Sequence, residues 1–198
     1  GALDAGIHTT PDPVTLQSML AGLRQDGASA VAMEVSSHAL DQGRAAAVQF
    51  DTAVLTNLSR DHLDYHGSME EYAASKRLLF QMPGLKSAVI NLDDPFAPKV
   101  LAALPEGVAA YGYSIHDHAD AVIRVSQANW TAEGIRAWLQ TPWGEGEFLC
   151  PLPGEFNLGN IAAAIASVVL AGEPLDQVLP QVATLTPVPG RLQAIPNS

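Results

Sequence analysis

The sequence predicts an α/β fold in which helices flank a mostly parallel sheet, with a small antiparallel β subdomain attached. Over the first half of the chain, short apolar runs alternate with longer segments of helical periodicity, and strand–helix repeats of this kind build parallel sheets. Between residues 121 and 152, apolar and polar residues alternate around glycines, which is typical of antiparallel strands and turns. At 198 residues with 47% hydrophobic content, the chain can bury one substantial core.

Start and stop signals place the elements in order. Asp12-Pro13 begins a helix ahead of leucines at helical spacing. Ser68 and Glu71 have the spacing of a capping box at the start of another helix, which Pro83-Gly84 ends. Helices are predicted at 13–27, 69–80, 93–104, 160–170 and 175–182, and buried strands at 30–35, 50–56 and 87–91.

Charge and cysteine content exclude several classes of protein. A net charge of −11 opposes binding to nucleic acid or to anionic membranes, which both attract basic patches. No apolar run approaches the ~20 residues that a membrane-spanning helix needs. The lone Cys150 can form neither an internal disulfide nor a thiolate zinc site. We therefore expect a cytoplasmic protein without nucleic-acid or membrane partners.

The segment 57–67, Asn-Leu-Ser-Arg-Asp-His-Leu-Asp-Tyr-His-Gly, directly follows the predicted strand 50–56. Open α/β sheets bind ligands beyond the carboxyl ends of their strands, and imidazole beside carboxylate suits a divalent cation or a proton transfer. A polar loop that caps the next helix is the alternative. A cap needs only Ser68 and Glu71, however, and it leaves four side chains unexplained: Asp61, His62, Asp64 and His66.

A second polar cluster has the same placement. Glu34 interrupts the predicted strand 30–35 near its end, where an unpaired carboxylate is costly to bury. The alternative is a glutamate at a frayed strand end that faces water. Because His62 follows another strand in the same way, the two strand ends could converge on one cation. Oxygen ligands with one imidazole favour magnesium or manganese over zinc.

Three stretches together resemble a known family: 33–38 (Met-Glu-Val-Ser-Ser-His), 56–67 and Ala74-Ser75-Lys76. They are similar to the central domain of Mur ligases, of the MurE type that adds the third residue of the peptidoglycan stem peptide. Order and spacing agree along nearly the whole chain, from Thr9-Thr10 to Gly190-Arg191. The resemblance implies a P-loop-NTPase-like domain, ATP as co-substrate, and two Mg²⁺ sites.

The resemblance also implies residue roles. Lys76 matches the lysine that the family carbamylates, and its carbamate with His62 would hold the second magnesium, while Glu34 matches the ligand of the first. Other matched positions bind the UDP-MurNAc-dipeptide, namely Thr9, Thr10, Ser36, Gln42 and Arg44. Nucleotide-side positions are Asn157, Asn160 and Arg191.

Each matched residue also has a purely structural interpretation. Alone, Lys76 would be a solvated helix lysine, Asn160 a helix cap and Arg191 a surface linker residue. Tyr65 and His66 are interpreted as supporting or packing residues rather than as ligands.

The sequence also departs from the family pattern. No Gly-Lys-Thr or Gly-Lys-Ser phosphate loop occurs in the 198 residues, His8 stands where the family has asparagine, and Gln193 stands where many relatives have glutamate. The resemblance then implies a central domain at 1–190 without its phosphate-loop segment, with an antiparallel subdomain at about 112–152. Residues 191–198 would begin a linker to a C-terminal domain.

Two hypotheses on function follow. The first is the central domain of an ATP-dependent amide ligase that acts as a monomer on UDP-MurNAc-dipeptide and an amino acid of the diaminopimelate, lysine or ornithine type. The isolated 198 residues are expected to be inactive, because they lack the amides that cradle ATP phosphates. The second is a non-catalytic, ligase-derived binding module.

Overall fold

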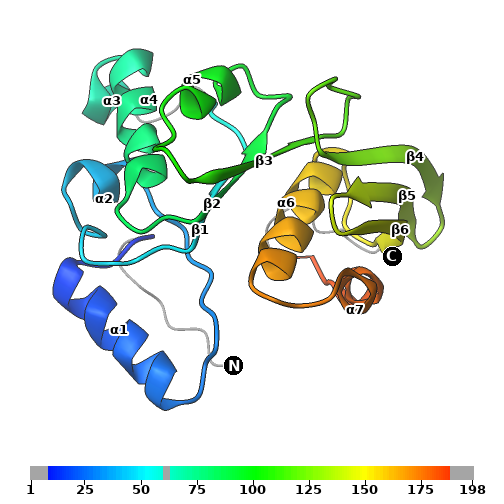
Figure 1. Ribbon diagram of the computed structural model, residues 1–198, viewed down its shortest axis with the longest axis horizontal. Helices are drawn as coiled ribbons and strands as arrows, with labels where there is room; N and C mark the ends of the chain where they lie inside the picture. The colour runs from blue at the N-terminus through cyan, green and yellow to red at the C-terminus, as the bar shows by residue number, and fades with distance from the viewer. Residues whose placement is uncertain (1–8, 60–62, 188–198) are drawn as a thin grey trace, which may run out of the picture. The chain divides into compact units, whose positions relative to one another are not determined.

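The computed structural model describes residues 9–59 and 63–187 (Figure 1). The chain divides into two compact units. The first draws on Gly1–Ala53, Leu58–Lys86 and Lys99–Val108, and the second on Val54–Asn57, Ser87–Pro98 and Ala109–Ser198. Among the described residues, no helix is both long and apolar enough to cross a membrane.

Helices and loops make up most of the first unit. It contains α1 (Pro13–Gln25), α2 (Ser37–Asp41), α3 (Leu63–His66), α4 (Met69–Arg77) and the 3₁₀ helix η1 (Leu78–Gln81). Asp12 caps α1 by accepting hydrogen bonds from the amides of Val14 and Thr15 at 3.0 and 3.1 Å. Hydrogen bonds from the Thr15 side chain and these amides hold the pKa of Asp12 below its usual value.

The Ser68 half of the predicted capping box at the start of α4 is confirmed. The Ser68 hydroxyl accepts a hydrogen bond from the Glu71 amide at 3.2 Å, so one of the free N–H groups at the helix start has a partner. The helix buries Tyr72, Ala73 and Ser75 on one face. This cap and this face fix the rotation of α4 about its axis.

A six-stranded sheet in the order β1 to β6 dominates the second unit (Figure 1). The strands are β1 (Thr52–Leu55), β2 (Ser87–Asn91), β3 (Ala109–Ser114), β4 (Ile123–Thr131), β5 (Gly134–Thr141) and β6 (Gly144–Cys150). Strands β2, β3 and β4 pair in parallel, whereas β5 pairs antiparallel with both β4 and β6. The predicted α/β class is therefore confirmed, and the antiparallel strands extend the parallel ones within one sheet.

Helix α6 (Phe156–Leu170) packs against this sheet, together with α7 (Leu175–Gln181) and η2 (Val182–Thr184). The buried residues of α6 recur at helical spacing, as in Leu158, Ile161 and Ile165. They meet the inward side chains of the strands, including Ile123 and Leu139, which are fully buried.

Burial also raises the pKa of Tyr113, with Asp93 and Asp94 adding to the effect, and it raises the pKa of the Cys150 thiol.

The prediction of a buried strand at 30–35 is wrong. Those residues have no strand assignment, Val31 is 47% exposed and Glu34 is exposed. An apolar run becomes a strand only where a neighbouring strand supplies hydrogen bonds, and none of the described strands pairs with it. Helices α5 and α6 differ most from their predicted bounds, because α5 covers only Ala97–Leu101 and α6 begins at Phe156.

Gly134 gives a test of the sheet. Its φ is +141°, and an added Cβ would lie 2.1 Å from the carbonyl oxygen of Cys150. Gly134→Ala should therefore lower the free energy of unfolding by about 1–3 kcal/mol. Gly22→Ala, in open space on α1, should instead raise it by up to about 1 kcal/mol. Urea titration of both variants checks this, and equal midpoints would contradict the close approach of β5 to Cys150.

Candidate substrate and metal site

The buried side chain of Thr10 organises one side of the site. It is 1% exposed, and its Oγ1 donates to the Glu34 carbonyl and accepts from the Ser36 amide, both at 3.0 Å. Ser36 in turn caps α2 by accepting from the Ala39 amide at 3.2 Å. Thr10 thus anchors the segment that carries Glu34 and Ser36, although that segment has no strand partner among the described strands.

Arg44 extends this network. Its Nη1 donates to the Thr10 carbonyl at 3.1 Å, its Nε donates to Gln42 Oε1 at 2.8 Å, and its Nη2 donates to the same oxygen. A guanidinium has five N–H donors, so within the described part of the chain some of them remain available to an anionic ligand. Four of the five residues predicted to bind substrate, Thr10, Ser36, Gln42 and Arg44, therefore lie in one hydrogen-bonded group, and Thr9 is exposed next to it.

Tyr65 holds the far end of the network. The Gln42 amide donates to the Tyr65 hydroxyl at 3.1 Å, and that hydroxyl donates to Asp41 Oδ2 at 2.8 Å. The Tyr65 ring also packs on His38, with ring centroids 4.1 Å apart. Sequence reasoning treated Tyr65 only as a supporting residue and did not identify Asp41. The sole signal for Tyr65 was its place in the polar segment 57–67.

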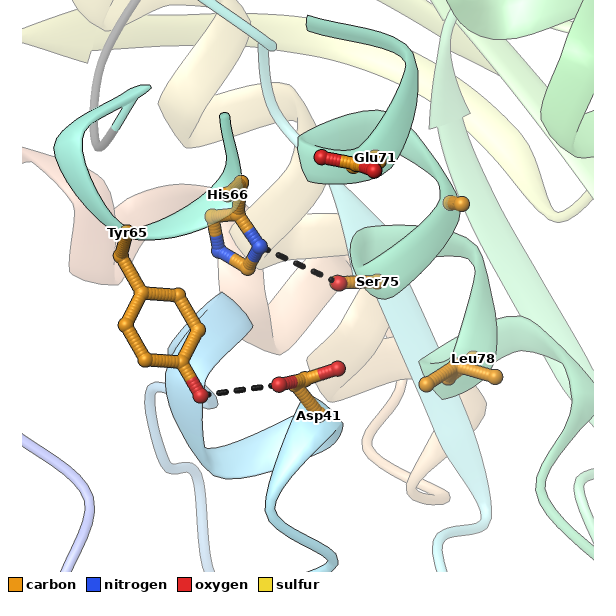
Figure 2. A pocket seen from close by; sticks show the side chains of 7 residues that line it. Asp41, Tyr65, His66, Glu71, Ser75 and Leu78 are labelled. Carbon is orange, nitrogen blue, oxygen red and sulfur yellow. Dashed lines mark hydrogen bonds between the residues drawn. The ribbon is translucent and has the colours of Figure 1, made fainter. Parts of the chain in front are cut away.

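A cavity of about 570 Å³ lies beside this network (Figure 2). Figure 2 shows Tyr65 and His66 opposite Glu71 and Ser75, which project from α4, with Asp41 below and between them. All of these residues belong to the first unit. The cavity therefore borders both α2, which Ser36 caps, and α4, which carries Lys76.

The predicted metal ligands are only partly described. Glu34 is exposed on the segment anchored by Thr10, and Lys76 is half-buried on α4 with its Nζ 5.8 Å from the centroid of the Tyr72 ring. His62 lies outside the described residues. Within residues 9–59 and 63–187, no group of three His, Cys, Asp or Glu side chains could hold a metal ion. The magnesium site stays a prediction that depends on His62 and on the carbamate of Lys76.

The predicted nucleotide residues lie in the second unit. Asn157 Nδ2 donates to the Pro153 carbonyl at 2.7 Å, and Asn160 Nδ2 donates to Asn157 Oδ1 at 3.2 Å. Because α6 begins at Phe156, Asn160 sits inside the helix and does not cap it. The two amides form one polar pair on the first turns of α6, while Arg191 lies outside the described residues.

Comparison with known proteins agrees with this fold. The family model of the Mur ligase middle domain matches residues 2–168. The chain belongs to the Mur ligase family, and the matched part is the middle domain. A relative from Pseudomonas aeruginosa, UDP-N-acetylmuramoyl-L-alanyl-D-glutamate–2,6-diaminopimelate ligase, is 52% identical over 195 residues, which are 98% of this chain and 40% of the relative.

Solved structures have a similar fold. A structure of a UDP-N-acetylmuramoyl-L-alanyl-D-glutamate–2,6-diaminopimelate ligase superposes with a TM-score of 0.88 and 36% identity, covering 96% of this chain and 39% of that one. Mycobacterium tuberculosis folylpolyglutamate synthase, solved in complex with ADP and AMPPCP, has a TM-score of 0.61 and 26% identity over 75% of this chain and 34% of its own. The chain spans about 40% of the length of the curated relatives it matches.

The Thr10 anchor gives a test of the site. Thr10→Val keeps the side-chain shape but leaves the Glu34 carbonyl and the Ser36 amide without their partner. Each such loss costs about 1–3 kcal/mol when the group stays buried, so the urea midpoint should fall clearly. Thr52→Val is the matched control, because the structure shows no hydrogen bond from the Thr52 hydroxyl within the described residues. If both variants unfold at the same urea concentration, Thr10 does not anchor the segment.

Proposed function

We propose that this chain supplies the middle domain of an ATP-dependent ligase that adds diaminopimelate to UDP-MurNAc-L-Ala-D-Glu during peptidoglycan synthesis. The observation that carries the proposal is the hydrogen-bonded network of Thr10, Ser36, Gln42 and Arg44. Resemblance of the sequence to the Mur ligase family, to which the chain belongs, gives these four residues a substrate-binding role. The names of the relatives favour diaminopimelate over lysine or ornithine as the added amino acid.

The proposed reaction has two steps. ATP phosphorylates the substrate carboxylate, and the incoming amine then displaces phosphate through a tetrahedral intermediate. In this scheme, the N–H groups of Arg44 that make no hydrogen bond within the described residues hold an anionic part of the nucleotide-linked substrate. The complex of the folylpolyglutamate synthase neighbour with ADP and AMPPCP supports an adenine nucleotide, and we assign Asn157, Asn160 and Arg191 to it.

Glu34 would hold one magnesium ion, and His62 with the Lys76 carbamate would hold a second. Bound there, magnesium would neutralise charge on the transferring phosphoryl group. The donor set of carboxylate, carbamate and imidazole suits this hard cation. The carbamate is needed because the ammonium of an unmodified lysine would repel the magnesium ion.

The experiment uses the natural gene product that carries this sequence. It is incubated with UDP-MurNAc-L-Ala-D-Glu, ATP and Mg²⁺, and separately with diaminopimelate, lysine or ornithine. We expect one ADP per tripeptide formed, with diaminopimelate as the preferred amine. Binding of the nucleotide-linked dipeptide without any product in the three mixtures would instead support the non-catalytic binding module.

Lys76→Ala in that gene product should nearly abolish activity. The carbamate supplies a metal ligand that the neighbouring side chains do not replace, and loss of one metal's charge stabilisation is worth several kcal/mol, or several powers of ten in rate. Short-chain carboxylic acids should restore part of the rate by occupying the emptied position.

Lys86→Ala is the control for this prediction. Lys86 pairs with Asp51 at 2.6 Å on the surface, with both side chains 75% exposed, and exposed pairs contribute little to stability. Its loss should leave turnover unchanged. Near-normal turnover of Lys76→Ala, with native circular dichroism, would refute the role of Lys76.

Arg44→Lys should raise the KM for the nucleotide-linked dipeptide by about 10- to 100-fold, since a hydrogen bond to a charged group is worth about 1.5–3 kcal/mol. Lysine keeps the charge but lacks the planar fork with which the Arg44 guanidinium bonds Gln42 and the Thr10 carbonyl while still facing a ligand. Arg136→Lys, at an exposed arginine paired with Glu147, should leave KM unaltered. Steady-state kinetics at saturating ATP separates the two variants.

A further inference from the structure

We propose that His66 is a positioning residue of this enzyme: it holds the helix that carries Lys76 against the helix that begins at Ser37. The inference rests on the proposed function, because the roles of Lys76 and Ser36 do. Sequence reasoning placed His66 among packing residues, and no comparison assigns it a role. The geometry around its ring points to more than packing.

Both ring nitrogens of His66 face a serine hydroxyl. Nε2 lies 2.8 Å from Ser37 Oγ on α2, and Nδ1 lies 3.4 Å from Ser75 Oγ on α4. The three side chains are buried, with His66 at 6% and Ser37 at 0% exposure. A neutral imidazole offers one donor and one acceptor, and a hydroxyl can serve either. His66, on α3, therefore connects three separate helices through one satisfied buried chain.

Each end of this chain adjoins a residue of the proposed site. Ser37 is the first residue of α2 and follows Ser36, which caps that helix. Ser75 precedes Lys76 on α4. Successive helix residues point in directions about 100° apart, so a helix held at Ser75 presents Lys76 at a fixed angle to one side. The spacing between Ser36 and Lys76 is thus set through His66.

A second contact runs from His66 to Lys76. The His66 ring packs against Tyr72 with centroids 5.4 Å apart, and Lys76 Nζ lies over the same Tyr72 ring. The Tyr65 ring also contacts the His66 ring, with centroids 4.7 Å apart in an edge-on arrangement. If removal of the imidazole shifts α4, the backbone at Lys76 and the Tyr72 ring beneath it both move.

Helix α2 has five residues and α3 has four. Helices this short are unstable on their own, because nucleation costs more than one turn of hydrogen bonds returns. Side-chain contacts must therefore define their positions. The buried His66 bonds are contacts that join them to the longer α4.

The test replaces His66 in the natural gene product by Phe, which keeps a ring but removes both hydrogen bonds, and by Gln, which keeps a polar group able to reach Ser37. A misplacement of about 1 Å can cost about 100-fold in rate. We expect His66→Phe to lower kcat about 100-fold with little change in the KM for ATP, and His66→Gln to recover at least about tenfold of that loss. Ser75→Ala should give a smaller loss of the same kind.

A specific readout separates positioning from a general effect on stability. A displaced Lys76 should retain its carbamate less well, so added bicarbonate should stimulate His66→Phe more than the wild type. His116→Phe, at an exposed histidine in the second unit, is the matched control and should behave as wild type. Circular dichroism and urea midpoints monitor folding, and if His66→Phe does not fold, His66→Gln and Ser75→Ala carry the test.

The outcomes are distinguishable. An inactive wild type refutes the proposed function itself, whereas full activity of Lys76→Ala refutes the role of Lys76 and with it the positioning inference. An active wild type with an inactive Lys76→Ala and fully active, folded His66→Phe and Ser75→Ala variants refutes only the positioning role. Equal losses in His66→Gln and His66→Phe, with one limb of the pH–rate profile missing, would make His66 an acid–base group and also overturn the inference.

Discussion

The candidate substrate site depends on the two hydrogen bonds of the Thr10 hydroxyl. In a sheet, a strand is held by ladder hydrogen bonds to its neighbours. The segment that carries Glu34 and Ser36 has no such ladder in the described part of the chain, and Thr10 supplies one acceptor and one donor bond in its place. The Thr10 carbonyl also accepts a hydrogen bond from Arg44. Thr10 therefore fixes both the segment that carries Glu34 and the guanidinium group of Arg44.

The two units use different means to hold polar groups in place. In the second unit, a hydrophobic core beneath α6 fixes the helix on which Asn157 and Asn160 lie. In the first unit, short helices are connected by buried side-chain bonds, of which those to His66 are the most enclosed. Unpaired buried polar groups are costly, so such bonds allow few alternative arrangements. The result is a precise site made from elements that have little stability of their own.

Local signals in the sequence predict the longer elements well. Helix α1 begins at Asp12-Pro13 and α4 at Ser68, as predicted, because caps act through neighbouring residues alone. The prediction of a strand at 30–35 is wrong because strand formation depends on a distant partner strand, which the apolar content of a segment does not report. Helices α2 and α3 were missed for a related reason: they are too short for periodicity to appear.

The site was predictable to a similar extent. Family resemblance grouped Thr10, Ser36, Gln42 and Arg44 by role, and the structure places them in one network. It could not indicate that Tyr65 bonds Asp41 and Gln42, because those contacts join residues more than 20 positions apart. Glu34, His62 and Lys76 stay predicted as metal ligands, since His62 lies outside the described residues.

The place of Lys76 over Tyr72 bears on its proposed chemistry. The face of an aromatic ring carries partial negative charge and attracts a cation within about 6 Å, so the ammonium of Lys76 has a reason to lie there. Carbamylation would replace that ammonium with an anion, and the same ring face would then repel it. The proposed modification would thus both create a magnesium ligand and release the side chain from Tyr72. The Tyr72 ring would therefore support only the unmodified lysine, whereas the contact of His66 with Ser75 would hold the backbone of α4 in both states.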